Sequence, residues 1–130
     1  MTVADASVVV AALVDSGPVG AWSEDRLRDD RLAAPHLMPA EVANVLRHSE
    51  LAGDLSADVT ALGHADLADL PVDLFPYEPF AARVWQLLSN LSAYDAWYVA
   101  LAEELDTSLV TLDQRLAAAP GPRCRFETPG

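Results

Sequence analysis

Two stretches at opposite ends of the chain share one arrangement that limits what the protein can fold into. In MTVADASVVVAAL at the N-terminus and SLVTLDQRL at residues 108–116, a short apolar segment leads into an aspartate, and a helix-like segment follows. Short apolar runs bounded in this way are typical of buried strands, and strands that alternate with helices favour a parallel sheet. Asp5 and Asp113 are therefore expected where a strand ends and a helix begins.

The rest of the chain continues this alternation, which predicts an α/β domain with a central, mainly parallel sheet flanked by helices. We expect strands around Val3 and Ala4 and at 31–34, 72–75, 108–112 and 123–126. We expect helices at 7–14, from Pro18, at 39–51, from Ser56, from Pro79 and from Ser92. In the helix at 39–51, the spacing of Val42, Val45, Leu46 and Ser49 predicts one packed face.

Length and composition indicate one globular domain over residues 1–130. Hydrophobic residues make up 52% of the chain, enough for a substantial core, yet no run approaches the roughly 20 apolar residues of a membrane span. No basic leader precedes Asp5, and the single cysteine, Cys124, excludes an internal disulfide. We therefore expect a cytoplasmic protein without a membrane segment.

The charge balance is strongly acidic. The chain has 20 acidic residues against 8 basic ones, all of them arginine, for a formal charge of −12. Such a surface repels nucleic acid at long range, so charge alone favours a role without nucleic acid. If the protein handles RNA or DNA, cations or a basic partner must offset this field.

Four acids occupy comparable places at the starts of predicted helices. Asp5 and Asp113 follow strands, whereas Glu41 and Asp95 lie in the first turns of the helices at 39–51 and after Ser92. In open parallel sheets, functional groups gather at the carboxyl ends of the strands. Asp95 also belongs to a strongly apolar segment, where a charge is costly unless it is paired, hydrogen-bonded or bound to a cation.

Each of these acids also has a purely structural explanation. Asp5 and Asp113 are suitable N-caps, and Glu41 suits the positive end of a helix dipole. Ser92 and Asp95 have the spacing of a capping box, with Asp in place of the usual Glu or Gln. For any one acid alone, this structural explanation is the stronger one.

Taken together, the four acids favour a metal site. Carboxylates that converge on one end of a sheet repel one another unless a divalent cation is bound. A donor set made only of oxygens suits Mg²⁺ or Mn²⁺ and requires no His or Cys.

The same residues carry a resemblance to a known family. The motifs VADASVVVAAL, PHLMPAEVANVLRH, LSAYDAWYVALAEEL and LVTLDQRL resemble those of PIN-domain ribonucleases, most closely the VapC-type toxins of bacterial toxin–antitoxin pairs. They occur in the family's order and roughly its spacing, so the resemblance covers nearly the whole chain. It implies a PIN-like three-layer domain.

The resemblance also implies an activity, a site and partners. The family's metal site maps onto Asp5, Glu41, Asp95 and Asp113, with Ser7 and Thr111 as supporting polar neighbours. The implied reaction is Mg²⁺- or Mn²⁺-dependent hydrolysis of RNA phosphodiester bonds. The implied partners are a cognate antitoxin, an RNA substrate and a second copy of the chain. The chain departs from the family in its high acidity and its lack of lysine. This departure concerns the surface that would contact RNA.

Two rival interpretations remain open. A response-regulator receiver also has Asp residues at strand ends, but its pattern needs a late lysine, and this chain has none. A non-catalytic module could use the PIN scaffold only for protein contacts, although such a role would not require four acids. Arg47, Arg83 and Arg115 are candidate phosphate contacts, with solvated surface positions the simpler explanation. Trp22, Trp85 and Trp97 are expected to pack in the core or an interface.

Overall fold

A twisted parallel sheet forms the centre of the structure, a computed structural model that describes residues 1–28 and 30–130. Within these residues the strands are β1 (Thr2–Ala4), β2 (Leu32–Pro35), β3 (Val72–Phe75), β4 (Leu109–Val110) and β5 (Phe126–Glu127). Their order is β3-β2-β1-β4-β5, and every neighbouring pair is parallel. The α/β prediction with a mainly parallel sheet is confirmed.

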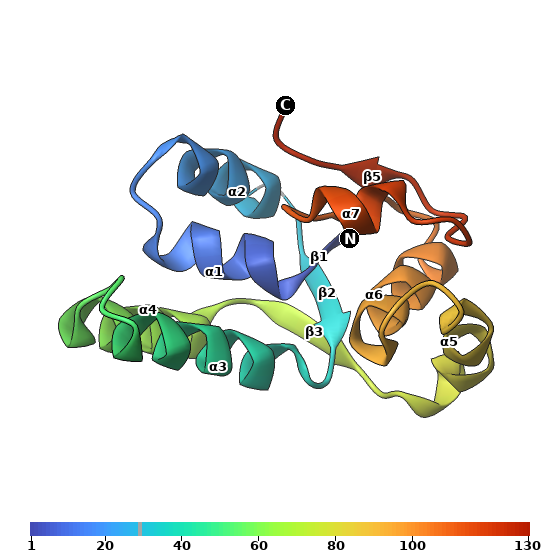
Figure 1. The fold of residues 1–130 in the computed structure, drawn as a ribbon, viewed down its shortest axis with the longest axis horizontal. Coiled ribbons are helices and arrows are strands. Elements are labelled where there is room, and N and C mark those ends of the chain that lie inside the picture. Colours follow the sequence, from blue (N-terminus) through green and yellow to red (C-terminus); the bar gives the residue numbers. More distant parts are fainter. Residues whose placement is uncertain (29) are drawn as a thin grey trace.

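Helices cover the sheet on both faces (Figure 1). They are α1 (Ala6–Val14), α2 (Pro18–Arg28), α3 (Met38–Leu51), α4 (Ala57–Asp69), η1 (Glu78–Phe80), α5 (Ala81–Leu87), α6 (Ala93–Glu104) and α7 (Gln114–Ala118). Helices α1 to α4 pack against one another on one side of the strands, whereas α6 contacts β1, β2 and β4 from the other side and carries α5. This arrangement leaves the carboxyl ends of the strands between α1 and α3 on one side and α6 on the other.

Side-chain caps explain where four of the helices begin. Asp5, Ser56, Ser92 and Asp113 each have extended backbone dihedrals, and each side chain accepts a backbone N–H from the first turn of its helix. These bonds satisfy donors that have no partner within a helix. The same local chemistry thus starts α4, which carries none of the candidate site acids, and the three helices whose caps or first turns hold Asp5, Asp95 and Asp113.

The core lies on both faces of β1, β2 and β4. Val3 and Leu109 are fully buried in the sheet, Val8 and Met38 are buried on the side of α1 and α3, and Leu101 is buried on the side of α6. Each fully buried aliphatic side chain contributes about 1.5–3 kcal/mol of transfer free energy. Because the core is continuous across the sheet, the strand ends are held by both helical layers.

One glycine is required by a close approach of backbone. A Cβ built on Gly20 would lie 1.8 Å from the carbonyl oxygen of Asp15, which no rotamer change could relieve. Gly20 therefore allows the first turns of α2 to pack on the end of α1, two helices that meet in a sharp bend of 112°. No single helix in the described residues is long and apolar enough to cross a membrane; α1 and α2 reach that length and composition only when the bent pair is taken together.

The structure corrects several predicted boundaries and faces. The strand predicted at 108–112 is limited to Leu109–Val110, because the N–H groups of Leu112 and Asp113 donate to side-chain hydroxyls instead of a neighbouring strand. The last strand begins at Phe126, and the helix predicted from Pro79 begins as the 3₁₀ turn η1.

One predicted core contact is also wrong, and one tryptophan predicted to pack in the core or an interface lies outside the core. Val45 is 41% exposed, because it faces a hollow beside α3 instead of the core. Trp85 is 77% exposed, because Val84 and Leu87 form the buried face of α5. Trp22 and Trp97 do pack against the core.

Candidate functional site

The ends of β1 and β4 bring the first candidate residues together. These strands are parallel neighbours, with Ala4 opposite Val110, so the residues that follow them also lie side by side. Asp5 follows β1 and its N–H donates to the carbonyl of Val110 at 3.0 Å, while Thr111 follows β4. The expected meeting of residues at the carboxyl edge of the sheet is therefore present.

Two hydroxyl groups hold the Asp5 carboxylate in place. The Ser7 hydroxyl donates to Asp5 Oδ1 and the Thr111 hydroxyl donates to Asp5 Oδ2, each at 2.5 Å. Each hydroxyl in turn accepts a backbone N–H, from Leu112 at 3.2 Å and from Asp113 at 3.0 Å. Asp5 Oδ1 also accepts the N–H groups of Ser7 and Val8 as the cap of α1. Asp5 is thus both a helix cap and the centre of a network that joins β1 to β4.

Asp5 is buried, with 7% of the residue's surface exposed. Burial raises the pKa of Asp5 because it disfavours the charged form, and the hydrogen bonds from Ser7, Thr111 and Val8 oppose that rise. A carboxylate held in this environment is stabilised further by any cation that approaches it.

Glu41 reaches the same edge from α3. The Tyr98 hydroxyl, buried on α6, donates to Glu41 Oε1 at 2.9 Å and so links the two helical layers. Burial raises the pKa of Glu41, the Tyr98 bond opposes this, and the charges of Asp95 and Asp5 raise the pKa further. The same surroundings hold the Tyr98 hydroxyl protonated, because burial and the Glu41 charge both raise its pKa.

Asp95 lies in the first turn of α6, three residues after the cap Ser92. The Ser92 hydroxyl accepts the Asp95 N–H at 3.2 Å, as the capping-box spacing predicts. Burial raises the pKa of the Asp95 carboxyl, the charges of Asp5 and Asp113 raise it further, and a hydrogen bond with Ser92 lowers it. The capping bond uses the backbone of Asp95, so the carboxylate is not needed for it.

Asp113 is half-buried and caps α7. Its Oδ1 accepts the N–H groups of Arg115 and Leu116 at 2.9 and 3.3 Å. In the described part of the chain, no hydrogen-bond donor contacts Oδ2 of Asp113 or Oε2 of Glu41. Each of these two carboxylates therefore keeps one oxygen available for a ligand.

All four predicted acids therefore interact electrostatically at one edge of the sheet. The negative charges of Asp5 and Asp113 raise the pKa of Asp95. Those of Asp95 and Asp5 raise the pKa of Glu41. Across residues 1–28 and 30–130, no three or more His, Cys, Asp or Glu side chains already form a group that could hold a metal ion. The acids are thus near enough to repel one another but do not close on a common point.

Comparison with known proteins gives the family. The PIN domain family model matches residues 2–122. Ribonuclease VapC1 of Mycobacterium tuberculosis is 39% identical over 126 residues, which cover 96% of this chain and 95% of that protein. Ribonuclease VapC12 of the same species is 35% identical over 127 residues, 98% of each chain. The chain belongs to the VapC ribonucleases of the PIN-domain family.

A solved structure with low sequence identity supports the same fold. The crystal structure of M. tuberculosis VapC20, described as a Sarcin-Ricin loop cleaving toxin, superposes with a TM-score of 0.68 at 12% identity. The match covers 91% of this chain and 94% of VapC20. It shows that the VapC-family sequence adopts the PIN-like three-layer fold, as the resemblance implied.

The donor chemistry of the four acids fits a hard divalent cation. All four side chains offer carboxylate oxygens, and the pKa values of Asp5, Glu41 and Asp95 are raised by burial and, for Glu41 and Asp95, by neighbouring negative charges. A bound cation would relieve these costs, and Mg²⁺ and Mn²⁺ prefer such ligands. Rotation of the side chains would have to bring their free oxygens together, since the acids do not form a closed group.

Tyr98 is the residue at this edge that sequence reasoning missed. It fixes one oxygen of Glu41, although it looks like one more apolar position of α6. Its spacing of three residues from Asp95 was a usable signal, because such residues share a helix face.

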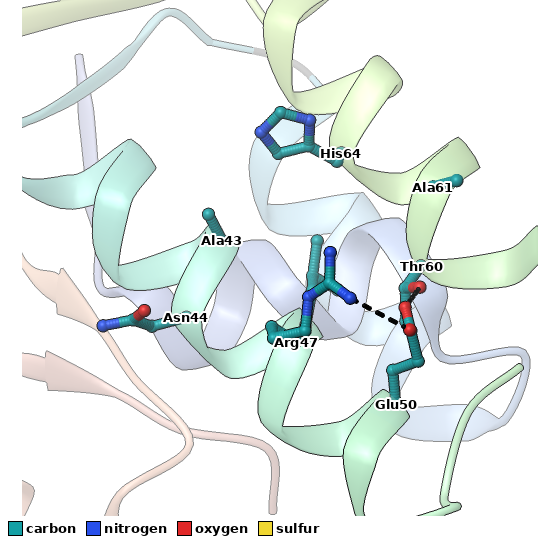
Figure 2. Close-up of a pocket in the computed structure, with 8 residues that line it drawn as sticks. Ala43, Asn44, Arg47, Glu50, Thr60, Ala61 and His64 are labelled. Atoms are coloured by element: carbon teal, nitrogen blue, oxygen red, sulfur yellow. Dashed lines mark hydrogen bonds and ion pairs between the residues drawn. The ribbon is translucent and has the colours of Figure 1, made fainter. Parts of the chain in front are cut away.

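Two of the predicted phosphate-binding arginines are engaged elsewhere. Arg83 donates to Glu103 at 2.7 and 3.0 Å, and Arg47 contacts Glu50 at 3.2 Å. Arg47 lies in a hollow of about 550 Å³ between α3 and α4, shown in Figure 2 with Thr60 and His64 on the opposite helix. None of the four acids lines this hollow, which is therefore separate from the candidate site. Arg115 is exposed, two residues after Asp113.

Proposed function

We propose that this chain is a divalent-metal-dependent endoribonuclease and the toxin of a toxin–antitoxin pair. The observation that carries the proposal is that Asp5, Glu41, Asp95 and Asp113 lie near enough to one another at the strand ends for their charges to interact. Family membership supports the same activity, because the relatives that match over nearly the whole chain are ribonucleases.

The proposed reaction is hydrolysis of an RNA phosphodiester bond. Asp5, Glu41, Asp95 and Asp113 would hold Mg²⁺ or Mn²⁺, which when bound acidifies a water and offsets charge that develops on the phosphate. Ser7 and Thr111 keep both oxygens of Asp5 in place, and Tyr98 orients Glu41. Outer contacts of this kind typically change metal affinity or activity by about 10–100-fold.

A cation at this site also reconciles RNA cleavage with the net charge of −12. The local potential at the four acids becomes less negative where a phosphate must approach. The proposal therefore does not need a large basic surface on the chain itself.

RNA cleavage is expected to require Mg²⁺ or Mn²⁺ and to stop when EDTA is added, because without a cation nothing acidifies the attacking water or offsets the charge that develops on the phosphate. The measurement is the appearance of defined fragments from structured RNAs on a denaturing gel, with each metal and with chelator. A control with Ca²⁺ separates catalysis from RNA folding. Fragments that persist unchanged in EDTA would contradict the metal-dependent mechanism.

The proposed partners are a small antitoxin and a second copy of the chain. An Arg or Lys of the antitoxin could enter the acidic site and compete with the metal, since a charge-assisted hydrogen bond is strong where water is partly excluded. Expression from the native operon should therefore yield a complex that contains toxin dimers. A toxin that elutes alone as a monomer would count against this assignment.

A non-catalytic PIN scaffold is the alternative. It predicts antitoxin or other protein binding with no metal-dependent cleavage. The cleavage assay with and without EDTA distinguishes the two functions directly.

A further inference from the structure

A second hollow adjoins the candidate site at Glu41. Its volume is about 480 Å³, within the range of small-ligand pockets. It is lined by Leu37, Ala40, Glu41, Asn44, Val45 and Tyr94. Because Glu41 belongs to both the hollow and the acidic edge, a ligand bound here would lie next to the four acids.

The walls of this hollow are aromatic and aliphatic. Tyr94, which directly precedes Asp95 on α6, is 55% exposed, and Leu37 and Val45 are 38% and 41% exposed. An exposed ring beside exposed aliphatic side chains is suited to stacking against a flat, apolar ligand. Aromatic stacking is the main way in which proteins hold the unpaired bases of single-stranded RNA.

Asn44 adds a polar group to the same hollow. Its amide carries both donors and an acceptor, which matches the paired donors and acceptors on the edge of a base. Asn44 also borders the hollow between α3 and α4, but Figure 2 shows its side chain pointing away from His64 and Thr60. Its amide is therefore not occupied by the Arg47–Glu50 contact on the α4 side of α3.

Charge decides which part of an RNA this hollow can accept. Among the described residues, Glu41 is the only charged residue that lines the hollow, and the chain as a whole carries a charge of −12, so a phosphate would be repelled. A nucleobase is neutral at pH 7 and pays no such cost. Stacking therefore lets an acidic protein hold RNA without a basic surface.

We propose that this hollow binds one unstacked nucleobase of single-stranded RNA, with Tyr94 stacked on the base and Asn44 hydrogen-bonded to its edge. The inference rests on the proposed ribonuclease function, because it makes the hollow a substrate subsite beside the cleavage site. Tyr94 and Asn44 then contribute to the choice of RNA sequence.

The test measures RNA binding in EDTA, where no cleavage occurs. The probe is a ten-nucleotide adenosine RNA that carries 2-aminopurine at its centre and a terminal dye for anisotropy. Tyr94→Ala is expected to weaken binding by roughly 5- to 150-fold, the range for loss of one base–aromatic stack. It should also reduce the 2-aminopurine quenching. Tyr94→Phe keeps the ring and should bind within about 2-fold of the parent.

Trp85→Ala is the matched control, because it removes a more exposed aromatic ring from α5, outside the hollow. It should leave binding unchanged. The salt dependence of binding should be the same for Tyr94→Ala and the parent, since a lost stack removes no phosphate contact. Asn44→Ala should change the relative affinity for adenosine, uridine and cytidine decamers.

Several results would overturn the inference. They are equal binding by Tyr94→Ala and the parent, equal losses in Trp85→Ala, or no binding of the decamers by the parent. Light scattering tests a further contradicting result. If Tyr94→Ala converts a dimer into monomers, the hollow binds a second copy of the chain and not a nucleobase. Tyr94-dependent binding without metal-dependent cleavage would leave the subsite in place and refute the nuclease. Metal-dependent cleavage together with unaltered RNA binding by Tyr94→Ala would support the nuclease and refute the subsite.

Discussion

Asp95→Asn is expected to lower RNA cleavage by more than about 100-fold while α6 keeps its cap. The Ser92 hydroxyl accepts the backbone N–H of residue 95, which the substitution preserves. The change removes one charge and one ligand oxygen, and loss of a direct ligand should exceed the effect of losing an outer contact. The measurement is the single-turnover cleavage rate at saturating Mg²⁺.

The stability of Asp95→Asn separates a ligand from a structural acid. In EDTA the variant should unfold at the same temperature as the parent or higher, because the charges of Asp5 and Asp113 no longer oppose a neighbouring carboxylate. Mg²⁺ should then raise the melting temperature of the parent more, since a ligand stabilises the folded state only as far as it binds it. Glu104→Gln, at the exposed far end of α6, is the charge-matched control. Equal Mg²⁺ shifts and full cleavage in Asp95→Asn would leave Asp95 with a structural role.

The same clustering predicts how stability without metal depends on pH. Asp5, Glu41 and Asp95 have raised pKa values, so the folded chain binds their protons more tightly than the unfolded chain. The ionised carboxylates destabilise the folded chain fully at pH values above their raised pKa values. This destabilisation disappears as the pH falls toward about 4, so the free energy of unfolding increases. Asp30, Asp73 and Glu103 have lowered pKa values and reduce stability only below about pH 4. Asp95→Asn should therefore show a smaller gain in the free energy of unfolding than the parent as the pH falls from 7 to about 4.

Asp5→Ala is expected to destabilise the protein by about 2–4 kcal/mol and to abolish cleavage. Loss of the α1 cap accounts for about 1–2 kcal/mol. The buried Thr111 hydroxyl and the Ser7 hydroxyl then lose their acceptor, which costs about 1–3 kcal/mol, partly offset by removal of a buried charge. Urea unfolding in EDTA measures this difference.

Asp5→Asn divides the two roles of this residue. Its side-chain oxygen can still cap α1, so stability should change by no more than about 1 kcal/mol, whereas cleavage should be lost with the charge. Ser56→Ala, which removes the cap of α4 away from the acids, should cost about 1 kcal/mol and leave cleavage intact. Full cleavage by Asp5→Asn would show that Asp5 acts only as a cap and network centre.

Local sequence patterns were sufficient to predict the architecture and the place of the four acids at the starts of helices. An apolar run before Asp5 and another before Asp113 indicated parallel strands that end at acids, because strand periodicity and capping depend on neighbouring residues. The start of α6 at Ser92 followed from the same chemistry. The choice between a cap and a ligand did not follow, since one carboxylate can serve both roles, as Asp5 does in its hydrogen bonds.

Only the tertiary structure decided which remote residues support the acids. The bonds of Thr111 to Asp5 and of Tyr98 to Glu41 join residues that are 106 and 57 positions apart. The exposure of Tyr94 and Val45 beside Glu41 likewise depends on how α6 and α3 meet across the strand ends. Helical spacing shows which residues share a face, but not what that face meets. Burial, mutual repulsion and the space left between helices are properties of the packed chain, and they arise only when the layers close on the sheet.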